Sequence, residues 1–411
     1  MSDTELERCR TRLTFTDATG ARWIRDEYGR LDCLRSELVM WVGDDIAKIF
    51  IEFRADIQSS YGVDVKLDIT DVGERLRRKY IAEARQAGNV DVFVGPHDWV
   101  GELVSEQAVE PVALSEEQRQ NLLDFSLQPF CFNGDIYGIP ATMDTVMLII
   151  NVDLVGDEPS CFEEVVEVGR ALQRANVGQE IIVVRVGPEG DPFLIWPLLS
   201  SGGAWLFGME PNGAWDIHQV GIDSPESISA FERIAALGEA GEGIIRCEMD
   251  QAWVERTFIG GTCPFMLGAY GDVARARDAG MNVVVSPVPG FRDGGPARSF
   301  TTIYGFYIAP FGRNRVIASD LLPDYLTRFD VMSALSARIG SPVARKEATA
   351  LTDSTTSELV SARDKTMLMP SFAEMPEVWG HLARAEVEVI AGADPGVSAR
   401  RAADAIRRTV S

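Results

Sequence analysis

Hydrophobic and polar residues follow two alternating spacings along most of the chain. Residues 38–42 form a short apolar run, and residues 46–57 then place apolar side chains on one face of a helix. Residues 63–69 alternate with period two, as a half-buried strand does, and a second helix is predicted at roughly residues 72–86. Another apolar run begins at residue 90. This order predicts an α/β fold that opens as a doubly wound sheet with parallel neighbouring strands.

Polar and aromatic residues follow the ends of two of these predicted strands. Asp44 and Asp45 follow the first strand, and His97, Asp98 and Trp99 follow the third. Ligands of open parallel sheets bind just beyond the carboxyl ends of the strands. Carboxylates accept hydrogen bonds from sugar hydroxyl groups, and aromatic rings pack against the apolar faces of sugars. The two strand ends therefore predict a carbohydrate-binding cleft.

Each of these residues also has a purely structural interpretation. Asp44 and Asp45 stand where a carboxylate caps a helix or stabilises its first turn, and one of them could do each. His97 could satisfy local backbone groups, and Trp99 could be a packed tryptophan.

The first 37 residues have a different pattern from the rest. Residues 13–16 and 22–24 are strand-like and flank a glycine-containing turn at 17–20, which predicts a β-hairpin. Tyr28 and Gly29 could form a second turn. A piece this small cannot bury a core of its own. We expect it to pack against the main body or a partner, or to be partly disordered.

Length and charge narrow the functional classes. With 411 residues the chain is expected to form two domains. Its net charge of −23 argues against binding to nucleic acid or to an anionic membrane surface. No apolar run approaches the roughly 18 residues that span a bilayer.

The amino terminus and the cysteines bear on localisation. The first residues contain no apolar segment typical of a signal peptide, so the sequence as it stands predicts a cytoplasmic protein unless an export signal has been removed. The six cysteines are widely scattered without a Cys-x-x-Cys spacing. That pattern predicts no zinc site and favours a reducing compartment.

Further motifs occur in a fixed order along the remainder of the chain. They are Tyr137-Gly138-Ile139-Pro140 with Asp144, residues 151–154, residues 191–198 with Gly202-Gly203, residues 215–217, residues 220–223, and Met369-Pro370 with Trp379. Together with the two strand ends, these motifs resemble those of the extracellular solute-binding proteins of ABC sugar importers, in particular the maltose-binding-protein-like branch. The resemblance covers about residues 38–411.

The resemblance implies a two-lobed periplasmic-binding-protein-like fold with crossing hinge strands, preceded here by the extension at residues 1–37. Lobe 1 is expected to comprise residues 38–142 and 288–341, and lobe 2 residues 146–286 and 346–411. In this family the sugar is held between the lobes, and hinge closure follows because sugar contacts to both lobes stabilise the closed form.

The resemblance also implies ligand-binding roles for residues in the second half of the chain. Asp144 and Asp191 match acidic sugar ligands, and Phe193, Tyr270 and Trp379 match aromatic stacking positions. Asp191 and Phe193, two residues apart, would point to the same side of an extended loop. Phe193 replaces the tyrosine commonly seen there, so stacking is kept and a hydroxyl contact is lost.

In the first half, either Asp44 or Asp45 matches the first-loop acidic residue of the family, and His97 with Asp98 matches a binding loop. Trp99 departs from the basic residue often found at its position. Gly95 stands where some members place a stacking tryptophan, a role that Trp99 could take over.

The resulting functional prediction is a non-enzymatic receptor for a sugar, such as a maltodextrin, that delivers it to the permease subunits of an ABC importer as a monomer without cofactor or metal. The chain lacks the nucleophile elbow, the His-Glu-x-x-His motif and the phosphate loop. A glycosidase would use a carboxylate pair such as Asp144 and Asp191. The second alternative is a cytoplasmic sugar sensor or regulatory adaptor, which the missing signal peptide and the extra residues 1–37 suggest.

Overall fold

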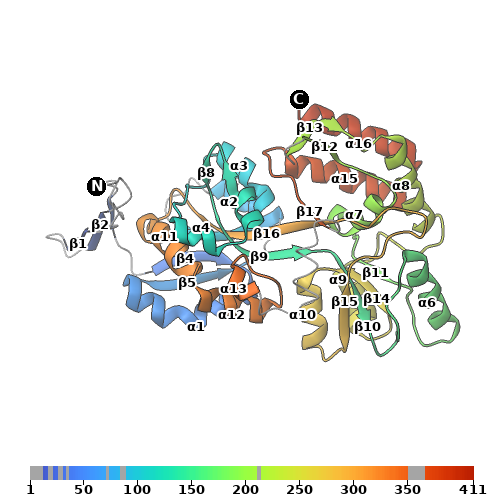
Figure 1. The fold of residues 1–411 in the computed structure, drawn as a ribbon, viewed down its shortest axis with the longest axis horizontal. Coiled ribbons are helices and arrows are strands. Elements are labelled where there is room, and N and C mark those ends of the chain that lie inside the picture. Colours follow the sequence, from blue (N-terminus) through green and yellow to red (C-terminus); the bar gives the residue numbers. More distant parts are fainter. Residues whose placement is uncertain are drawn as a thin grey trace. The chain divides into compact units, whose positions relative to one another are not determined.

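The computed structural model describes residues 13–16, 22–25, 31–33, 37–70, 74–83, 89–210, 214–349 and 366–411. The chain has an α/β fold and divides into two compact units (Figure 1). Unit 1 contains Met1–Thr142, Ile303–Arg338 and Val343–Thr349, and unit 2 contains Met143–Thr302, Ile339–Pro342 and Ala350–Ser411.

The sheet of unit 1 confirms the predicted parallel start. Strand β4 (Glu37–Val42) pairs in parallel with β5 (Asp64–Ile69) on one side and with β6 (Val92–Pro96) on the other. The second half of β16 (Ser299–Ile308) then adds to β6 in the antiparallel direction, with Tyr304 opposite Pro96. The carboxyl ends of β4 and β6 therefore lie side by side, which places the two predicted binding loops at one edge of the sheet.

Helix α1 (Asp44–Tyr61) covers this sheet with the predicted apolar stripe. Ile46, Ile49, Phe50 and Ile57 are buried. The helix stops at Gly62, whose φ of 70° is a left-handed conformation that glycine adopts without steric cost. The other elements of unit 1 are α2 (Glu74–Glu83), α3 (Val100–Ser105), α4 (Glu116–Asn121), α5 (Asp124–Leu127), β7 (Cys131–Phe132), β8 (Asp135–Ile136), α11 (Arg315–Leu321), α12 (Phe329–Ile339) and α13 (Lys346–Thr349).

The predicted amino-terminal hairpin is present as part of a three-stranded sheet. Strand β1 (Leu13–Thr16) pairs antiparallel with β2 (Arg22–Arg25), with Leu13 opposite Arg25. Strand β2 pairs in turn with β3 (Leu31–Cys33). The predicted turns at 17–20 and at Tyr28-Gly29 lie outside the described residues.

Unit 2 is built on an antiparallel core of strands. Strand β10 (Met147–Asn151) lies between β14 (Phe265–Gly268) and β15 (Val283–Ser286) and is antiparallel to both. The short β11 (Val183–Val184) adds to β14 in parallel. The other elements are α6 (Phe162–Arg174), α7 (Pro192–Ser201), β12 (Phe207–Met209), β13 (Trp215–Val220), α8 (Pro225–Leu237), α9 (Gln251–Val254), α10 (Tyr270–Asp278), β17 (Thr366–Leu368), α15 (Met375–Ile390) and α16 (Pro395–Thr409).

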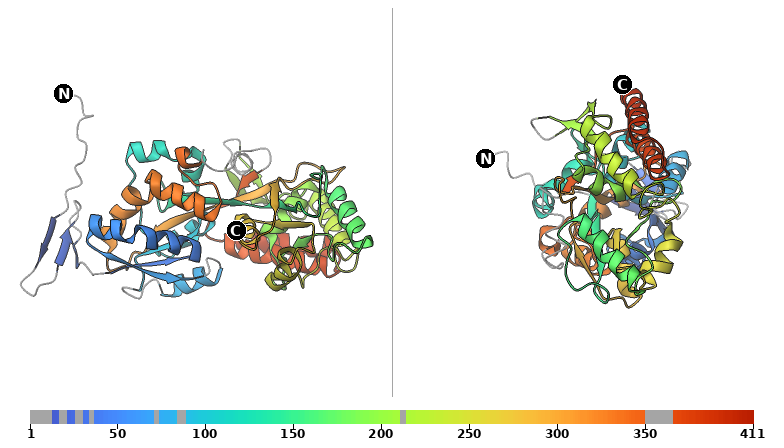
Figure 2. Two further views of the ribbon diagram at one scale, coloured as in Figure 1. Left: turned by 90° about the horizontal axis from the view of Figure 1, so that it is seen from below. Right: turned by 90° about the vertical axis from the view of Figure 1, so that its right-hand side faces the viewer.

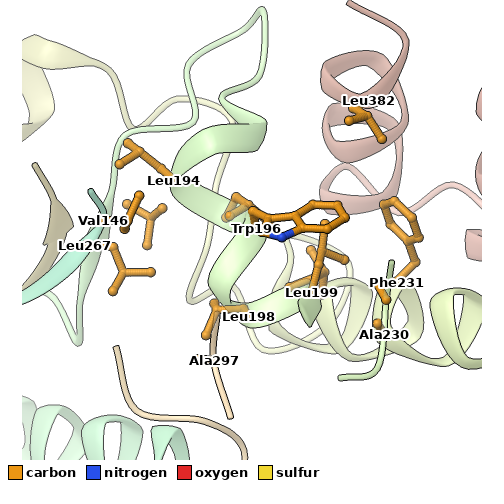
Figure 3. Close-up of a cluster of buried hydrophobic side chains, with 14 of the residues drawn as sticks. Val146, Leu194, Trp196, Leu198, Leu199, Ala230, Phe231, Leu267, Ala297 and Leu382 are labelled. Carbon is orange, nitrogen blue, oxygen red and sulfur yellow. The ribbon is translucent and has the colours of Figure 1, made fainter. Parts of the chain in front are cut away.

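A continuous hydrophobic core fills unit 2 between these strands and helices. Trp196 extends from α7 into this core, toward Phe231 of α8 (Figure 3). Its ring stacks on Phe300 with the ring centroids 4.8 Å apart. The carboxyl-terminal helices α15 and α16 lie side by side against α8 (Figure 2). Burial of one such large side chain contributes about 2–3 kcal/mol, so α7 is firmly held.

The boundaries of the units differ from the expected ones near residue 300. The chain passes from one unit to the other within β9 (Ile139–Thr145) and again within β16. Residues 288–302, predicted to belong to lobe 1, belong to unit 2. Two backbone hydrogen bonds attach this segment to unit 2. Gly290 O accepts from Phe162 N, and Ser201 O accepts from Gly295 N.

None of the helices in the described ranges is long and apolar enough to cross a membrane.

Candidate functional site

A group of half-buried carboxylates lies in unit 2 where β9 meets the start of α10. Asp144 Oδ1 accepts hydrogen bonds from the backbone N–H of Thr145 at 3.0 Å and of Tyr270 at 3.1 Å. Burial raises the pKa of Asp144 to about 7, although these two N–H donors oppose the rise. A carboxyl that titrates near neutrality can both donate and accept a hydrogen bond, depending on its protonation.

Arg185 is the cation that holds this acidic group together. It follows β11 directly, and its guanidinium lies 3.8 Å from an oxygen of Asp191 and 3.6 Å from one of Asp272. Its Nη1 also donates to Gln251 Oε1 at 3.2 Å. Asp272 pairs in addition with Arg275, and its Oδ2 accepts from the backbone N–H of Ala269 at 2.9 Å. One guanidinium thus connects the starts of α7, α9 and α10.

Asp191 occupies the amino-terminal end of α7. Its Oδ1 accepts from Leu194 N at 3.3 Å, so the side chain caps the helix. Burial raises the pKa of Asp191 to about 6, and the positive charge of Arg185 opposes this rise. The side chain keeps 28% of its surface exposed, and its Oδ2 is the oxygen that lies 3.8 Å from Arg185.

Glu386 lies behind Asp191 and is almost fully buried. Its Oε1 accepts from the backbone N–H of Asp191 at 3.2 Å. Burial raises the pKa of Glu386 well above its usual range, with the charge of Asp191 adding to the effect. Burial therefore favours the protonated, neutral form of Glu386, and the backbone N–H of Asp191 donates to this side chain.

The predicted aromatic residues of unit 2 have different surroundings. Tyr270 is buried at the first position of α10, next to Asp144. Phe193 is partly buried in the first turn of α7. The expectation of an extended loop for Asp191 and Phe193 is wrong, because Asp191 caps the helix and Phe193 lies inside it. Trp379 in α15 is partly buried, with its ring edge-to-face on Phe300 at 5.5 Å.

The candidates at the end of β6 in unit 1 are buried. His97 is fully buried, and its Nδ1 accepts from Ile303 N at 2.9 Å, which leaves the proton on Nε2. This is the backbone-satisfying role that the sequence allowed for His97. Trp99 is also buried, and its ring packs against Gly95 so closely that an added Cβ there would lie 2.4 Å from Trp99 Cε3. Asp98, between them, is buried as well.

Asp44 and Asp45 are exposed in the first turn of α1. The residue that caps this helix is Gly43, so the capping interpretation is wrong for both aspartates, although their charge still favours the helix amino terminus. Lys48 lies 2.5 Å from Asp44 and 3.4 Å from Asp45. Arg338 lies 3.9 Å from Asp45. Both carboxylates thus have cationic neighbours while remaining accessible.

The structure joins three of the ten candidates into one group. Asp144 and Tyr270 are hydrogen-bonded directly, and Asp191 is connected to them through Arg185 and Asp272. Sequence reasoning missed Arg185, Asp272 and Glu386. Arg185 carried a usable signal, because it is a charged residue at the end of the apolar run 181–184. Among the described residues, no cluster of His, Cys, Asp and Glu has a geometry suited to a metal ion.

Comparison with known proteins identifies related sequences. The model of the bacterial extracellular solute-binding protein family matches residues 52–362. The chain is 24% identical over 384 residues to a maltooligosaccharide ABC transporter solute-binding lipoprotein of Streptococcus pneumoniae, covering 91% of this chain and 89% of that protein. It is 22% identical to a galactooligosaccharide-binding protein of Bacillus subtilis, over 70% of this chain and 68% of that protein. It is also 22% identical to a maltotriose-binding protein of Pyrococcus abyssi, over 73% and 65% of the two chains.

Proposed function

The chain belongs to the bacterial extracellular solute-binding protein family, and from this premise we propose that it binds an oligosaccharide for import by an ABC transporter. Proteins of this family are binding proteins and not enzymes, which excludes the glycosidase alternative. The relatives named above bind maltooligosaccharides, galactooligosaccharides or maltotriose. Sugar is therefore the ligand class, and permease subunits are the partner class. Nothing in these relatives supports the sensor or adaptor alternative.

The observation that carries the proposal is the carboxylate group around Arg185. Asp144 and Asp191 come from different segments, lie beside the start of α10 and at the start of α7, and are both only partly buried. Sugar hydroxyl groups donate well to such carboxylates, and the charge-assisted hydrogen bonds are the stronger kind. Because Arg185 neutralises part of the negative charge, the acids remain ionisable without repelling each other strongly.

We further propose that the aromatic residues supply the apolar part of the binding energy. Phe193 follows Asp191 by two residues and is only partly buried, so its ring can pack against the C–H face of a sugar. Trp379 is partly buried as well and is the second stacking candidate. Asp44, Asp45 and Asp98 remain proposed contacts from unit 1. We leave His97 and Trp99 out of the proposed set, because packing within unit 1 accounts for their side chains.

Isothermal titration with maltotriose, a longer maltodextrin and a galactooligosaccharide tests this proposal. We expect one of these sugar classes to bind with a dissociation constant near the micromolar range, which corresponds to about −8 kcal/mol. Asp191→Asn should weaken binding, whereas Asp404→Asn, an exposed aspartate on α16, should not. Absence of binding by every sugar, or equal affinity in the two variants, would contradict the proposal. Small-angle scattering with and without the bound sugar would test the proposed hinge closure.

A further inference from the structure

A cavity of about 400 Å³ lies in unit 2 at the carboxyl-terminal end of α7. Its walls are mainly aromatic and thioether side chains, from Trp196, Trp205, Phe207, Met209, Trp215 and Met367. Asp191 caps the opposite end of α7, and a helix of 10 residues is about 15 Å long. The cavity is therefore separate from the carboxylate group proposed to bind sugar. Its volume falls within the range of small-molecule sites.

The tryptophan at the mouth of this cavity is held in place but remains accessible. An added Cβ on Gly221 would lie 2.1 Å from Trp205 Cδ2, so the indole ring packs directly against the Gly221 backbone. Trp205 nevertheless keeps 38% of its surface exposed. A large apolar ring that is fixed on one face and exposed elsewhere is a preformed binding surface, because little side-chain entropy is lost when a ligand packs against it.

The indole and guanidinium groups of the cavity are hydrogen-bond donors, and none of the described lining residues is acidic. The indole Nε1–H of Trp196 is buried and has no acceptor among the described residues. Within the same ranges, no carboxylate pairs with the exposed guanidinium of Arg298. Indole and guanidinium groups have no acceptor function at all. The exposed Arg298 guanidinium therefore favours a ligand that brings acceptor atoms.

The backbone of Arg298 is held in place by the side chain of Ser200. The hydroxyl of Ser200, in the last turn of α7, accepts from Arg298 N at 2.9 Å and lies 3.1 Å from Arg298 O. The Ser200 hydroxyl also lies 2.9 Å from Pro197 O, so its hydrogen-bonding capacity is used within the protein. Among the described residues of the cavity lining, Arg298 offers the only charged group.

We propose that this cavity binds a small aromatic carboxylate. The ring of the ligand packs against Trp205 and Trp215, and its carboxylate accepts hydrogen bonds from the Arg298 guanidinium. A neutral sugar fits less well, because the described lining residues offer no carboxylate to its hydroxyl groups. The recognition is local, since the net charge of −23 on the whole chain does not attract anions from a distance.

Titration calorimetry with indole-3-acetate and its neutral analogue indole-3-acetamide tests the proposal. We expect saturable binding of one indole-3-acetate per chain and at least about tenfold weaker binding of the amide. Arg298→Gln should weaken the acetate about tenfold and leave the amide unchanged, whereas Trp205→Ala should weaken both. Arg292→Gln is the matched control, because Arg292 lies in the same segment but pairs with Glu167 outside the cavity. Unchanged melting temperatures by circular dichroism would show that the variants are folded.

Three results would overturn the proposal. They are absence of saturable binding to the wild-type protein, equal affinity for the acetate and the amide, and unchanged acetate binding in Arg298→Gln. Competition by maltotriose would also overturn it, because that would place the carboxylate in the sugar site. The first three readouts do not depend on whether the protein binds an oligosaccharide, so the two proposals can fail separately.

Discussion

The backbone N–H of Tyr270 donates a hydrogen bond to Oδ1 of Asp144 over 3.1 Å, so the first turn of α10 begins against a carboxylate of β9. The bond stabilises the ionised carboxylate, as does the second one from Thr145 N. Burial acts in the opposite direction and dominates, since it raises the pKa of Asp144 to about 7. A residue proposed to bind ligand thus changes its charge close to neutral pH.

The first prediction concerns the pH dependence of stability. The pKa of Asp144 is about 7 in the folded state and 3.8 for an ordinary aspartate, so between these values the folded state holds a proton that the unfolded state releases. The free energy of unfolding should therefore fall as the pH rises through this window. Asp144→Asn removes this effect and keeps an oxygen acceptor for both N–H groups. Between pH 5 and 8 the wild type should lose on the order of 2 kcal/mol relative to the variant.

Urea unfolding at four pH values would measure this difference, with the exposed Asp404→Asn as control. Parallel curves for the wild type and Asp144→Asn would show that Asp144 is ionised throughout the range and would contradict the assignment.

The second prediction distinguishes two replacements of Glu386. Because burial favours the neutral form of this carboxyl, Glu386→Gln, which resembles that form, should change the free energy of unfolding by less than about 1 kcal/mol. Glu386→Ala removes the acceptor of the Asp191 N–H and leaves a cavity, so it should cost about 2–4 kcal/mol. Unfolding at pH 7 tests both. A Glu386→Gln variant as unstable as Glu386→Ala would show that the charged form of Glu386 matters.

The third prediction, which assumes that sugar binding uses ionised Asp191, concerns Arg185. The positive guanidinium lowers the pKa of Asp191 and holds it to about 6 against the effect of burial. Arg185→Gln should raise the pKa of Asp191. As the pH is lowered, Asp191 then becomes protonated earlier, so the variant should lose sugar affinity at a higher pH than the wild type does. Calorimetric affinities from pH 5 to 8 would show the shift. Arg275→Gln is the matched control, because Arg275 pairs with Asp272 and not with Asp191. If the sugar affinities of Arg185→Gln and of the wild type fall at the same pH, Arg185 does not set the pKa of Asp191.

Much of the fold was predictable because its signals are local in the sequence. The apolar stripe from Ile46 to Ile57 and the glycine stop at Gly62 depend on neighbours a few residues apart, and both predictions are confirmed. The second passage of the chain between the units was predicted near residue 288, but it occurs within β16, between Thr302 and Ile303. The turns near residue 288 are visible in the sequence, but the hydrogen bonds of Gly290 and Gly295 to distant residues are not.

The site was less predictable for the same reason. Arg185 and Asp191 are close in sequence, but Asp272 comes from a distant segment and meets them only because three helix starts converge on one guanidinium. Glu386 has a buried helical position that, in sequence, is no different from an exposed one. The resemblance to the solute-binding family therefore indicated acids that could accept hydrogen bonds from a ligand, but not the residues that set the charge of these acids.

The fourth prediction separates the two aromatic regions of unit 2. Trp379→Ala should weaken oligosaccharide binding by roughly 2 kcal/mol if its ring is a stacking anchor, which is about thirtyfold in the dissociation constant. Trp205→Ala removes a tryptophan of the separate cavity and should leave oligosaccharide affinity unchanged. Calorimetry on both variants, with circular dichroism as the test of folding, would decide. If only Trp205→Ala weakened sugar binding, Trp205 and not Trp379 would be the residue that stacks on the sugar.

The last prediction tests whether Trp99 is committed to packing in unit 1. The ring lies on Gly95, where an alanine Cβ would approach Trp99 Cε3 to 2.4 Å and Cζ3 to 2.5 Å. Gly95→Ala should therefore destabilise the protein by about 1–3 kcal/mol, the usual cost of overpacking a core. Replacing the ring in the double variant Gly95→Ala/Trp99→Leu removes the clash, so the two substitutions should show a coupling energy of about 1 kcal/mol or more. Additive effects in this double-mutant cycle, measured by urea unfolding, would mean that the ring does not rest on Gly95. Trp99 would then be available to stack on a sugar and would return to the set of proposed ligand contacts.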